Sequence, residues 1–236
     1  MCGRFVASSS AEHIADFFGA SFNAESLPAN FNVAPTADVY GVVAGPDGVP
    51  SLQIFHWGLV PSWAKDIKIG SKMTNARSET LAEKPAFKSL FRTHRVILPM
   101  DGFYEWRAAH VGAPLTKAGK PIKQPMFIHR ADGEPLSVAG LWGTWRDRSA
   151  GPDAPWLHSC TVITTSANEL MRPVHDRMPV MLDRTDWHEW LDPGNTDLDV
   201  LGRLLVPAPE HLLTMHAVST EVNDSRNSGS QLIDPI

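Results

Sequence analysis

Apolar runs separated by turn residues predict a chain rich in β-strands. The runs are short, as strands are, and are bounded by Gly, Pro, Asn and Asp. Two of them lie on either side of Gly45-Pro46-Asp47-Gly48 and predict a β-hairpin across this turn. The strand-like runs are residues 37–44, 49–56, 95–100, 126–129, 136–145, 159–165, 180–182 and 212–218.

Helical patterns occur at fewer places. Ser9-Ser10-Ala11-Glu12 is a capping-box pattern, and the apolar residues that follow share one helical face up to Gly19. The segment 30–36, between this helix and the predicted hairpin, is expected to be a polar loop. Further helices are expected from the junction at 71–80 to about Phe91, and over 184–191 and 196–206.

The size and composition of the chain predict one domain. A chain of 236 residues with 43% apolar residues can bury a full core, so we expect a single domain over residues 1–236. No run approaches the ~18 uninterrupted apolar residues of a membrane-spanning helix. The chain does not open with a basic region followed by an apolar run. We therefore expect no membrane partner and no signal peptide.

Cysteine and histidine usage argues against disulfides and metals. The only cysteines, Cys2 and Cys160, favour a reducing compartment and predict a cytoplasmic protein. Cys160 lies inside a strand-like run and is expected to be a small core residue. The ten histidines follow no metal-binding spacing, and neither CxxC nor HExxH occurs. We expect no metal ion and no cofactor.

The net charge of −5 conceals a strong asymmetry along the chain. Residues 65–130 contain 13 Lys and Arg against 5 Asp and Glu, a local excess of +8, and the rest of the chain carries −13. A basic face on an acidic protein attracts phosphate backbones, so this segment indicates nucleic acid as a partner. The alternative is a solvated, lysine-rich surface without a partner.

The start of the chain carries the most distinctive chemistry. Removal of Met1 is favoured by a small next residue and would give Cys2 a free α-amine beside its thiol. Both groups are partly nucleophilic at neutral pH. Such a 1,2-aminothiol can attack an acyl group with its own amine as base, or trap an aldehyde as an imine that the thiol closes into a thiazolidine. If Met1 is retained, Cys2 is a frayed terminal residue.

The polar residues at 75–79 are candidates for phosphate binding. Asn75 and Arg77 lie at the predicted loop-to-helix junction, where backbone N–H groups and a guanidinium can hold a phosphate. Glu79, in the same cluster, has a simpler interpretation as a first-turn carboxylate that complements the helix dipole.

Two further residues are candidates for proton transfer. Glu105 lies among Phe103, Tyr104 and Trp106, and aromatic surroundings favour a neutral carboxyl that can shuttle protons. The alternative is a surface glutamate on the polar side of a strand. His175, with Asp and Arg beside it just before a strand-like run, is an acid-base candidate. Trp57 and Trp63, next to the basic segment, fit either core packing or base stacking.

Short motifs follow one another along the whole chain. They are MCGRF at 1–5, NFNVAPT at 30–36, HWGLVPSWAKD at 56–66, TNARSET at 74–80, DGFYEW at 101–106, AGLW at 139–142, TTSAN at 164–168, HDRMP at 175–179 and VS..VN..RN.G at 218–229. In this order they resemble the SOS response-associated peptidase family, also described as abasic-site processing proteins. The chain departs from the usual family residues at Phe5, Asn30-Phe31 and Gly143.

The resemblance implies a fold and an activity. The implied fold is one compact α+β domain with a curved, largely antiparallel, barrel-like sheet, flanking helices and a groove for single-stranded DNA. The implied activity, in the DNA-damage (SOS) response, is covalent capture of abasic sites as a thiazolidine on Cys2 after Met1 removal. Autoproteolytic and AP-lyase-type activity accompany it, and the implied protein is a monomer.

The resemblance also assigns roles to individual residues. It implies Cys2 as the nucleophile, Asn75 as the residue that positions the opened sugar, Glu105 as the proton shuttle and His175 as the residue that assists imine chemistry. The implied DNA contacts are phosphate binding by Arg4, Arg77 and Arg177, and a groove lined by Trp106 and Thr164.

Two other classes of function remain open at this point. Class II glutamine amidotransferases also begin Met-Cys-Gly, so an N-terminal-nucleophile cysteine amidohydrolase is an alternative. Their further glycine-rich and asparagine-bearing motifs are not found in this chain. The other alternative is a non-enzymatic reader of modified bases that uses the same groove without the chemistry of Cys2.

Overall fold

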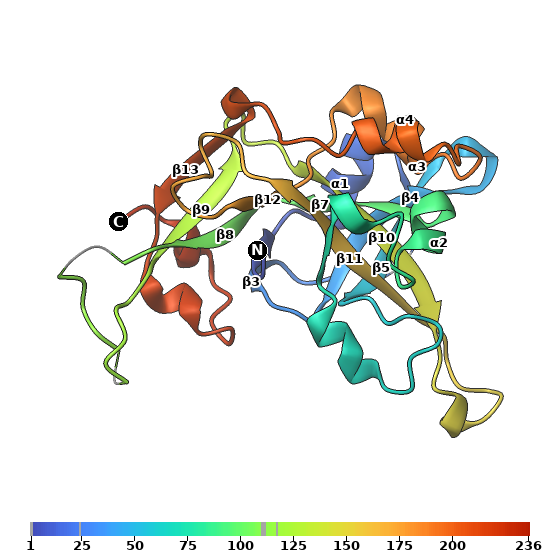
Figure 1. Cartoon of the computed structure of the whole chain (residues 1–236), viewed down its shortest axis with the longest axis horizontal. Helices are drawn as coiled ribbons and strands as arrows, with labels where there is room; N and C mark the ends of the chain where they lie inside the picture. Colours follow the sequence, from blue (N-terminus) through green and yellow to red (C-terminus); the bar gives the residue numbers. More distant parts are fainter. Residues whose placement is uncertain (1, 24, 110–111, 117) are drawn as a thin grey trace.

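The strands form two sheets that lie side by side in the computed structural model (Figure 1), which describes residues 2–23, 25–109, 112–116 and 118–236. The five-stranded sheet is antiparallel throughout, in the order β13-β9-β8-β1-β3. Its strands are β1 (Phe5–Ala7), β3 (Asn30–Val33), β8 (Gly102–Arg107), β9 (Gln124–Arg130) and β13 (Leu213–Ala217).

The second sheet closes into a small barrel. Strand β11 pairs with β10, and the pairing continues through β7 and β4 to β5, which pairs back with β11. Within this ring of five described strands the closing pair, β5 with β11, is parallel and the other four pairs are antiparallel. The barrel strands are β4 (Asp38–Ala44), β5 (Pro50–Trp57), β7 (Arg95–Met100), β10 (Leu136–Trp145) and β11 (Leu157–Ser166). Short strands β2 (Ser21–Phe22), β6 (Asn75–Arg77) and β12 (Arg177–Pro179) extend it.

Two glycines make room inside the barrel. A Cβ on Gly41 of β4 would lie 2.7 Å from Cγ2 of Val96, and a Cβ on Gly140 of β10 would lie 2.7 Å from the carbonyl oxygen of Thr161. Both distances are shorter than van der Waals contact, so a larger residue would force the strands apart. A closed barrel of so few strands has a narrow interior, and glycine is the residue that fits it.

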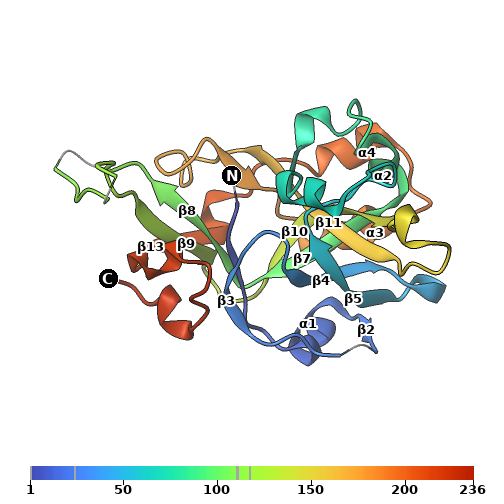
Figure 2. The same cartoon turned by 90° about the horizontal axis from the view of Figure 1, so that it is seen from below.

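Apolar side chains pack on both the inner and the outer face of the barrel's sheet. The inner layer, which includes Trp57 and Val96, continues into the space between the barrel and the five-stranded sheet, where Phe5 joins it. The outer layer packs Ile97 and Trp190 under the helices. These helices are α1 (Ala11–Phe18), α2 (Lys88–Thr93), α3 (Trp187–Leu191) and α4 (Leu198–Arg203). Figure 2 shows the first described residues, in dark blue, running between the two sheets.

Most of the predicted elements are confirmed. The hairpin is formed by β4 and β5, which pair in register from Asp38 opposite His56 to Ala44 opposite Pro50. The helix expected before Gly19 is α1, whose N-cap Ser10 accepts a hydrogen bond from the backbone N–H of His13. The fold is α+β with curved, largely antiparallel sheets and flanking helices, as the family resemblance implied.

The segment 30–36 is not the polar loop that its composition predicts. Asn30–Val33 forms strand β3 and pairs with β1, with Val33 opposite Phe5. The side chain of Asn32 is buried, because it satisfies several backbone carbonyls. Its polarity therefore marks a buried hydrogen-bonding centre rather than exposure to water.

The helix predicted from 71–80 to Phe91 is wrong over most of its length. Asn75–Arg77 forms strand β6, parallel to β11 with Asn75 opposite Val162, and a regular α-helix occupies only Lys88–Thr93. Pairing with a strand far along the chain overrides the local helical preference. Asn75 and Arg77 therefore lie in a strand, and Arg77 precedes only the single 3-10 turn Ser78–Thr80 rather than the long helix predicted there.

Candidate functional site

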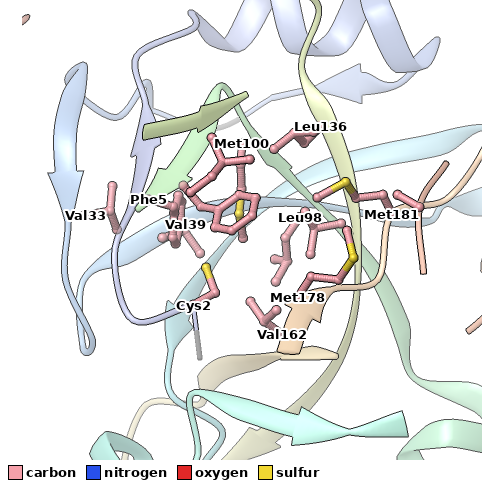
Figure 3. Packing of buried hydrophobic residues seen from close by; sticks show 14 of the residues in the cluster. Cys2, Phe5, Val33, Val39, Leu98, Met100, Leu136, Val162, Met178 and Met181 are labelled. Atoms are coloured by element: carbon pink, nitrogen blue, oxygen red, sulfur yellow. The ribbon is translucent and has the colours of Figure 1, made fainter. Parts of the chain in front are cut away.

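Cys2 lies in the apolar space between the barrel and the five-stranded sheet. Its side chain is 1% exposed and belongs to the inner core layer. Figure 3 shows its sulfur pointing into this cluster, which includes Phe5 and Met178. The backbone carbonyl of Cys2 accepts a hydrogen bond of 2.9 Å from Nδ2 of Asn75. Cys2 is therefore anchored in the core rather than frayed.

The thiol of Cys2 is held in its neutral form. Burial raises its pKa well above the ordinary value, and the negative charge of the Glu105 carboxylate raises this pKa further. Glu105 is itself buried, at 4% exposure, on β8. Strand β8 pairs with β1, with Phe103 opposite Phe5, so Glu105 lies in the same sheet as the residues that follow Cys2. A carboxylate beside a protonated thiol can accept the thiol proton when the thiol becomes a nucleophile.

Asn75 links Cys2 to the barrel. Strand β6 places Asn75 beside β11, and its Nδ2 donates both to the carbonyl of Cys2 and, at 3.2 Å, to the hydroxyl of Thr74. Its Oδ1 is buried and accepts no hydrogen bond from the described part of the chain. A buried acceptor in this position can receive a hydrogen bond from a hydroxyl of a bound sugar.

His175 lies immediately before β12. Its Nδ1 accepts a hydrogen bond of 2.9 Å from the backbone N–H of Arg177 and lies 2.9 Å from Oδ1 of Asp176. When Nδ1 accepts from the backbone, the neutral ring carries its proton on Nε2. When the ring is protonated, Nδ1 can donate to Asp176 instead. The imidazole thus has a hydrogen-bond partner in both protonation states.

Arg177 on β12 forms a two-point ion pair with Glu79. Nη1 and Nη2 donate to the two carboxylate oxygens of Glu79 at 2.5 and 2.9 Å, and Nη2 also donates to the carbonyl of Thr164 at 2.6 Å. The pair lowers the pKa of Glu79 through these hydrogen bonds. Thr164 is 1% exposed, so the hydrogen bond to its carbonyl holds Arg177 against a buried strand. A phosphate that binds this end of Arg177 would meet a carboxylate already there.

Arg4 is held by neutral partners instead. Its Nη1 donates to Oδ1 of Asn32 at 2.8 Å and to the carbonyl of Val222 at 2.9 Å. Partial burial lowers the pKa of Arg4, and the carboxylate of Asp224 acts in the opposite direction. No hydrogen bond from its Nε or Nη2 to the rest of the described chain is formed. These donors can therefore serve a phosphate without displacing another group.

Trp106, the residue after Glu105, is fixed by the C-terminal part of the chain. Its Nε1 donates to Oδ1 of Asn223 at 2.6 Å. Neither Asn32 nor Asn223 was identified as a site residue from the sequence. The signal that could have found them is their place in two of the recognised motifs, NFNVAPT and VS..VN..RN.G.

Cys2 therefore lies between two groups of predicted site residues. We call the first the barrel wall: Asn75, Arg77, Thr164, His175 and Arg177, carried by or next to β6, β11 and β12. We call the second the sheet wall: Arg4, Glu105 and Trp106, carried by or next to β1 and β8. Cys2 contacts the barrel wall through Asn75 and is influenced electrostatically by Glu105 of the sheet wall.

The basic segment 65–130 is not a uniform surface. Arg77 is exposed and forms no ion pair within the described chain. Arg95 is buried, and its guanidinium donates to five backbone carbonyls at the ends of α2 and α3. The two tryptophans also differ. Trp57 is a core residue, whereas Trp63 is 61% exposed. Cys160 is buried in the core, as predicted.

The described part of the chain contains neither a metal-binding cluster nor a membrane-spanning helix. No group of three or more His, Cys, Asp or Glu side chains there is arranged to hold a metal ion. No helix among the described residues has the length and apolar character needed to span a membrane.

Comparison with known proteins places the chain in a family. A family model described as SOS response associated peptidase (SRAP) matches residues 1–225. Abasic site processing protein YoaM of Bacillus subtilis is 38% identical over 99% of this chain and 98% of its own length. Abasic site processing protein YoqW of the same organism is 40% identical, with 99% of both chains covered.

The chain belongs to the SRAP family. The chain has the same fold as a protein from Bacteroides thetaiotaomicron in a crystal structure, with a TM-score of 0.85 over 100% of both chains at 24% identity. The SRAP match confirms the resemblance drawn from the motifs, and it spans both walls and Asn223. The roles of the individual SRAP residues stay predictions.

Proposed function

We propose that this protein captures abasic sites in single-stranded DNA as a covalent thiazolidine on Cys2, after removal of Met1. The observation that carries the proposal is the buried centre formed by Cys2, Asn75 and Glu105. It combines a potential 1,2-aminothiol, an amide with an unused acceptor and a buried glutamate whose charge acts on the thiol. The names of the curated relatives, abasic site processing proteins, support the same substrate.

The chemistry follows from the groups present. The ring-opened deoxyribose of an abasic site carries an aldehyde at C1. The α-amine of Cys2 adds to this carbon, and loss of one water gives an imine. The thiol then adds to the imine carbon, its proton passes through Glu105 to the imine nitrogen, and the five-membered ring closes. The net change is loss of one water. Asn75 positions the sugar, and His175 assists proton transfer during imine formation.

The same intermediate accounts for the accompanying activities. An imine that is not closed by the thiol can lose the 3′ phosphate by β-elimination, which is AP-lyase-type strand cleavage. Autoproteolytic activity, in this proposal, is confined to exposing Cys2 by removal of Met1. The protein acts as a cytoplasmic monomer that associates with DNA.

The two walls provide the proposed DNA-binding groove. Arg77 and Arg177 of the barrel wall and Arg4 of the sheet wall bind phosphates on either side of the lesion. Trp106 offers a face on which a neighbouring base can stack, and Thr164 supports Arg177. A single strand is favoured, because seating the sugar against buried Cys2 requires its neighbouring bases to be splayed apart.

Incubation with an oligonucleotide that contains one abasic site tests the proposal. We expect a protein-DNA complex that survives SDS without any reducing agent, and more of it from single-stranded than from duplex substrate. An amidohydrolase would give no adduct and would hydrolyse glutamine instead. A non-enzymatic reader would bind the oligonucleotide but release it in SDS. Either outcome would reject covalent capture.

A further inference from the structure

The C-terminal part of the chain packs against the outer face of the five-stranded sheet. Val218, Val222 and Leu232 are fully buried there and share a core cluster with Tyr104 of β8. Figure 1 shows this part of the chain, in red, beside β9 and β13 and far from the barrel helices α2 and α3. The VS..VN..RN.G motif lies in it. The proposed chemistry does not by itself explain why that motif is present.

Asn32 fixes the backbone of this motif on both sides of Asn223. Its Nδ2 donates to the carbonyl of Val222 at 3.2 Å and to the carbonyl of Asp224 at 3.0 Å. The same nitrogen also lies 2.9 Å from the carbonyl of Asn227. Because the carbonyls of the residues before and after Asn223 are held by one buried side chain, Asn223 has little freedom to move.

Asn223 in turn holds Trp106. The bond of 2.6 Å from Nε1 of Trp106 to Oδ1 of Asn223 fixes the indole at its polar edge. The apolar part of the ring packs against the cluster that contains Tyr104 and Val222. Packing alone permits the ring to rotate, whereas packing with one hydrogen bond selects a single orientation. The residue before Trp106 is Glu105, whose carboxylate acts on the thiol of Cys2.

We propose that Asn223 is a positioning residue of the abasic-site centre, which sets the orientation of Trp106 from outside the groove. The inference rests on the proposed function, because it assumes that Trp106 contacts the DNA beside the lesion. Asn32 fixes the backbone around Asn223, Asn223 holds the indole of Trp106, and Trp106 contacts the DNA. The side-chain hydrogen bond of Asn223 goes to Trp106 and not to Cys2.

A double-mutant cycle on Asn223 and Trp106 tests the link. The readout is single-turnover crosslinking to abasic single-stranded DNA, measured as the rate at saturating DNA and as the half-saturating DNA concentration. Asn223→Ala is expected to raise the half-saturating concentration about 3- to 10-fold, the effect of one lost hydrogen bond, with a smaller effect on the saturated rate. Trp106→Phe removes the donor and keeps a ring. In that background, Asn223→Ala should have no further effect.

Asn227→Ala is the matched control. It removes one asparagine side chain from the same segment, but the Nδ2 of Asn227 donates to the carbonyl of Glu221 within that segment. Its half-saturating concentration should stay within about 2-fold of the wild type. If Asn227→Ala and Asn223→Ala have equal effects, the segment acts only through its stability, and the inference is wrong.

The outcomes separate the two proposals. If the wild type and Asn227→Ala form the adduct but Asn223→Ala matches them, or if the effects of Asn223→Ala and Trp106→Phe add, the positioning role is rejected and covalent capture stands. If the wild type forms no SDS-stable adduct, covalent capture fails and the positioning role fails with it. Should Asn223→Ala not fold, Asn223→Ser, which keeps a shorter acceptor, takes its place with the same expected direction.

Discussion

The two walls beside Cys2 hold their arginines in different ways. In the barrel wall, Arg177 is paired end-on with the partly exposed carboxylate of Glu79. In the sheet wall, Arg4 is held by the amide of Asn32 and a backbone carbonyl, and neither of these partners is charged. A phosphate can bind Arg4 without displacing a group, whereas it must displace or share Glu79 to bind the same end of Arg177.

This difference separates fixed from exchangeable parts of the site. Buried hydrogen bonds that satisfy neutral groups are rigid, because breaking them leaves polar atoms unpaired in the core. A half-exposed ion pair exchanges with solvent or with another anion at little cost. We therefore expect Cys2 and the sheet wall to keep their arrangement when DNA binds, and Arg177 of the barrel wall to exchange Glu79 for a phosphate.

The largest effect is expected from Cys2→Ala. Without the thiol, the imine cannot close, so stable adduct should fall at least about 10³-fold while transient imine and some strand cleavage remain. The matched control is Cys160→Ala, which removes the other fully buried cysteine of the same core and should still crosslink. Gel analysis without reductant measures both. A stable adduct from Cys2→Ala would remove the thiol from the mechanism.

The second-largest effect on crosslinking is expected from Glu105→Gln. It preserves shape but removes the group that accepts the thiol proton, so single-turnover crosslinking should slow about 10²-fold. The pKa of the Cys2 thiol should also fall, because burial still raises it but the carboxylate no longer does. Thiolate absorbance in a Cys160→Ala background measures this pKa. An unchanged crosslinking rate together with an unchanged pKa would make Glu105 a structural residue.

Asn32→Ala tests the rigidity of the sheet wall. It removes the hydrogen bonds that Asn32 makes to Nη1 of Arg4 and to the carbonyls of Val222, Asp224 and Asn227. We expect the free energy of unfolding to fall by about 1–3 kcal/mol. Denaturant titration measures it. If the free energy of unfolding falls no more than it does on substitution of an exposed residue, the sheet wall is no more rigid than the barrel wall.

The smallest effect is expected from Glu79→Gln, which tests whether the Arg177–Glu79 ion pair exchanges with a phosphate. The pair lowers the pKa of Glu79, so its contribution to stability is present above pH ~4.3 and disappears as the pH falls below that value. Because Glu79 is about half exposed, this contribution is below about 1 kcal/mol. Releasing Arg177 should tighten binding of single-stranded DNA by up to about 5-fold.

Glu83→Gln is the control for that variant. It removes the same charge from a nearby exposed carboxylate that forms no ion pair within the described residues. Affinity at low salt, measured with an undamaged oligonucleotide, distinguishes the two. If both variants tighten binding equally, the effect is one of net charge alone, and Glu79 does not compete with phosphate for Arg177.

Local patterns were sufficient for much of the fold. Residues 136–145 were predicted as a strand and form β10 over the same range, because a long apolar run between turns has few other solutions. The hairpin and α1 followed from turn and capping residues. Strand β6 was missed, since only its pairing with β11 makes it a strand. No local pattern contains that information.

The candidate site, like the fold, could be predicted from the sequence only in part. The chemistry of Cys2 could be proposed from its residue type and position. The partners of Asn75, Arg177 and Arg4 could not be, because each contact joins segments far apart in the sequence. Asn32 was misjudged for the same reason. A polar residue next to predicted turns suggests exposure, and only the folded chain shows the carbonyls that it satisfies.

The most direct test of the central claim is the intact mass of the crosslinked product. The account predicts one protein chain lacking Met1 plus one abasic oligonucleotide minus one water, with no adduct from protein that retains Met1. Blocking the α-amine of Cys2 should likewise prevent formation of this species. An adduct of the same stability on a chain that keeps Met1, or a mass that does not show loss of one water, would contradict thiazolidine formation at Cys2.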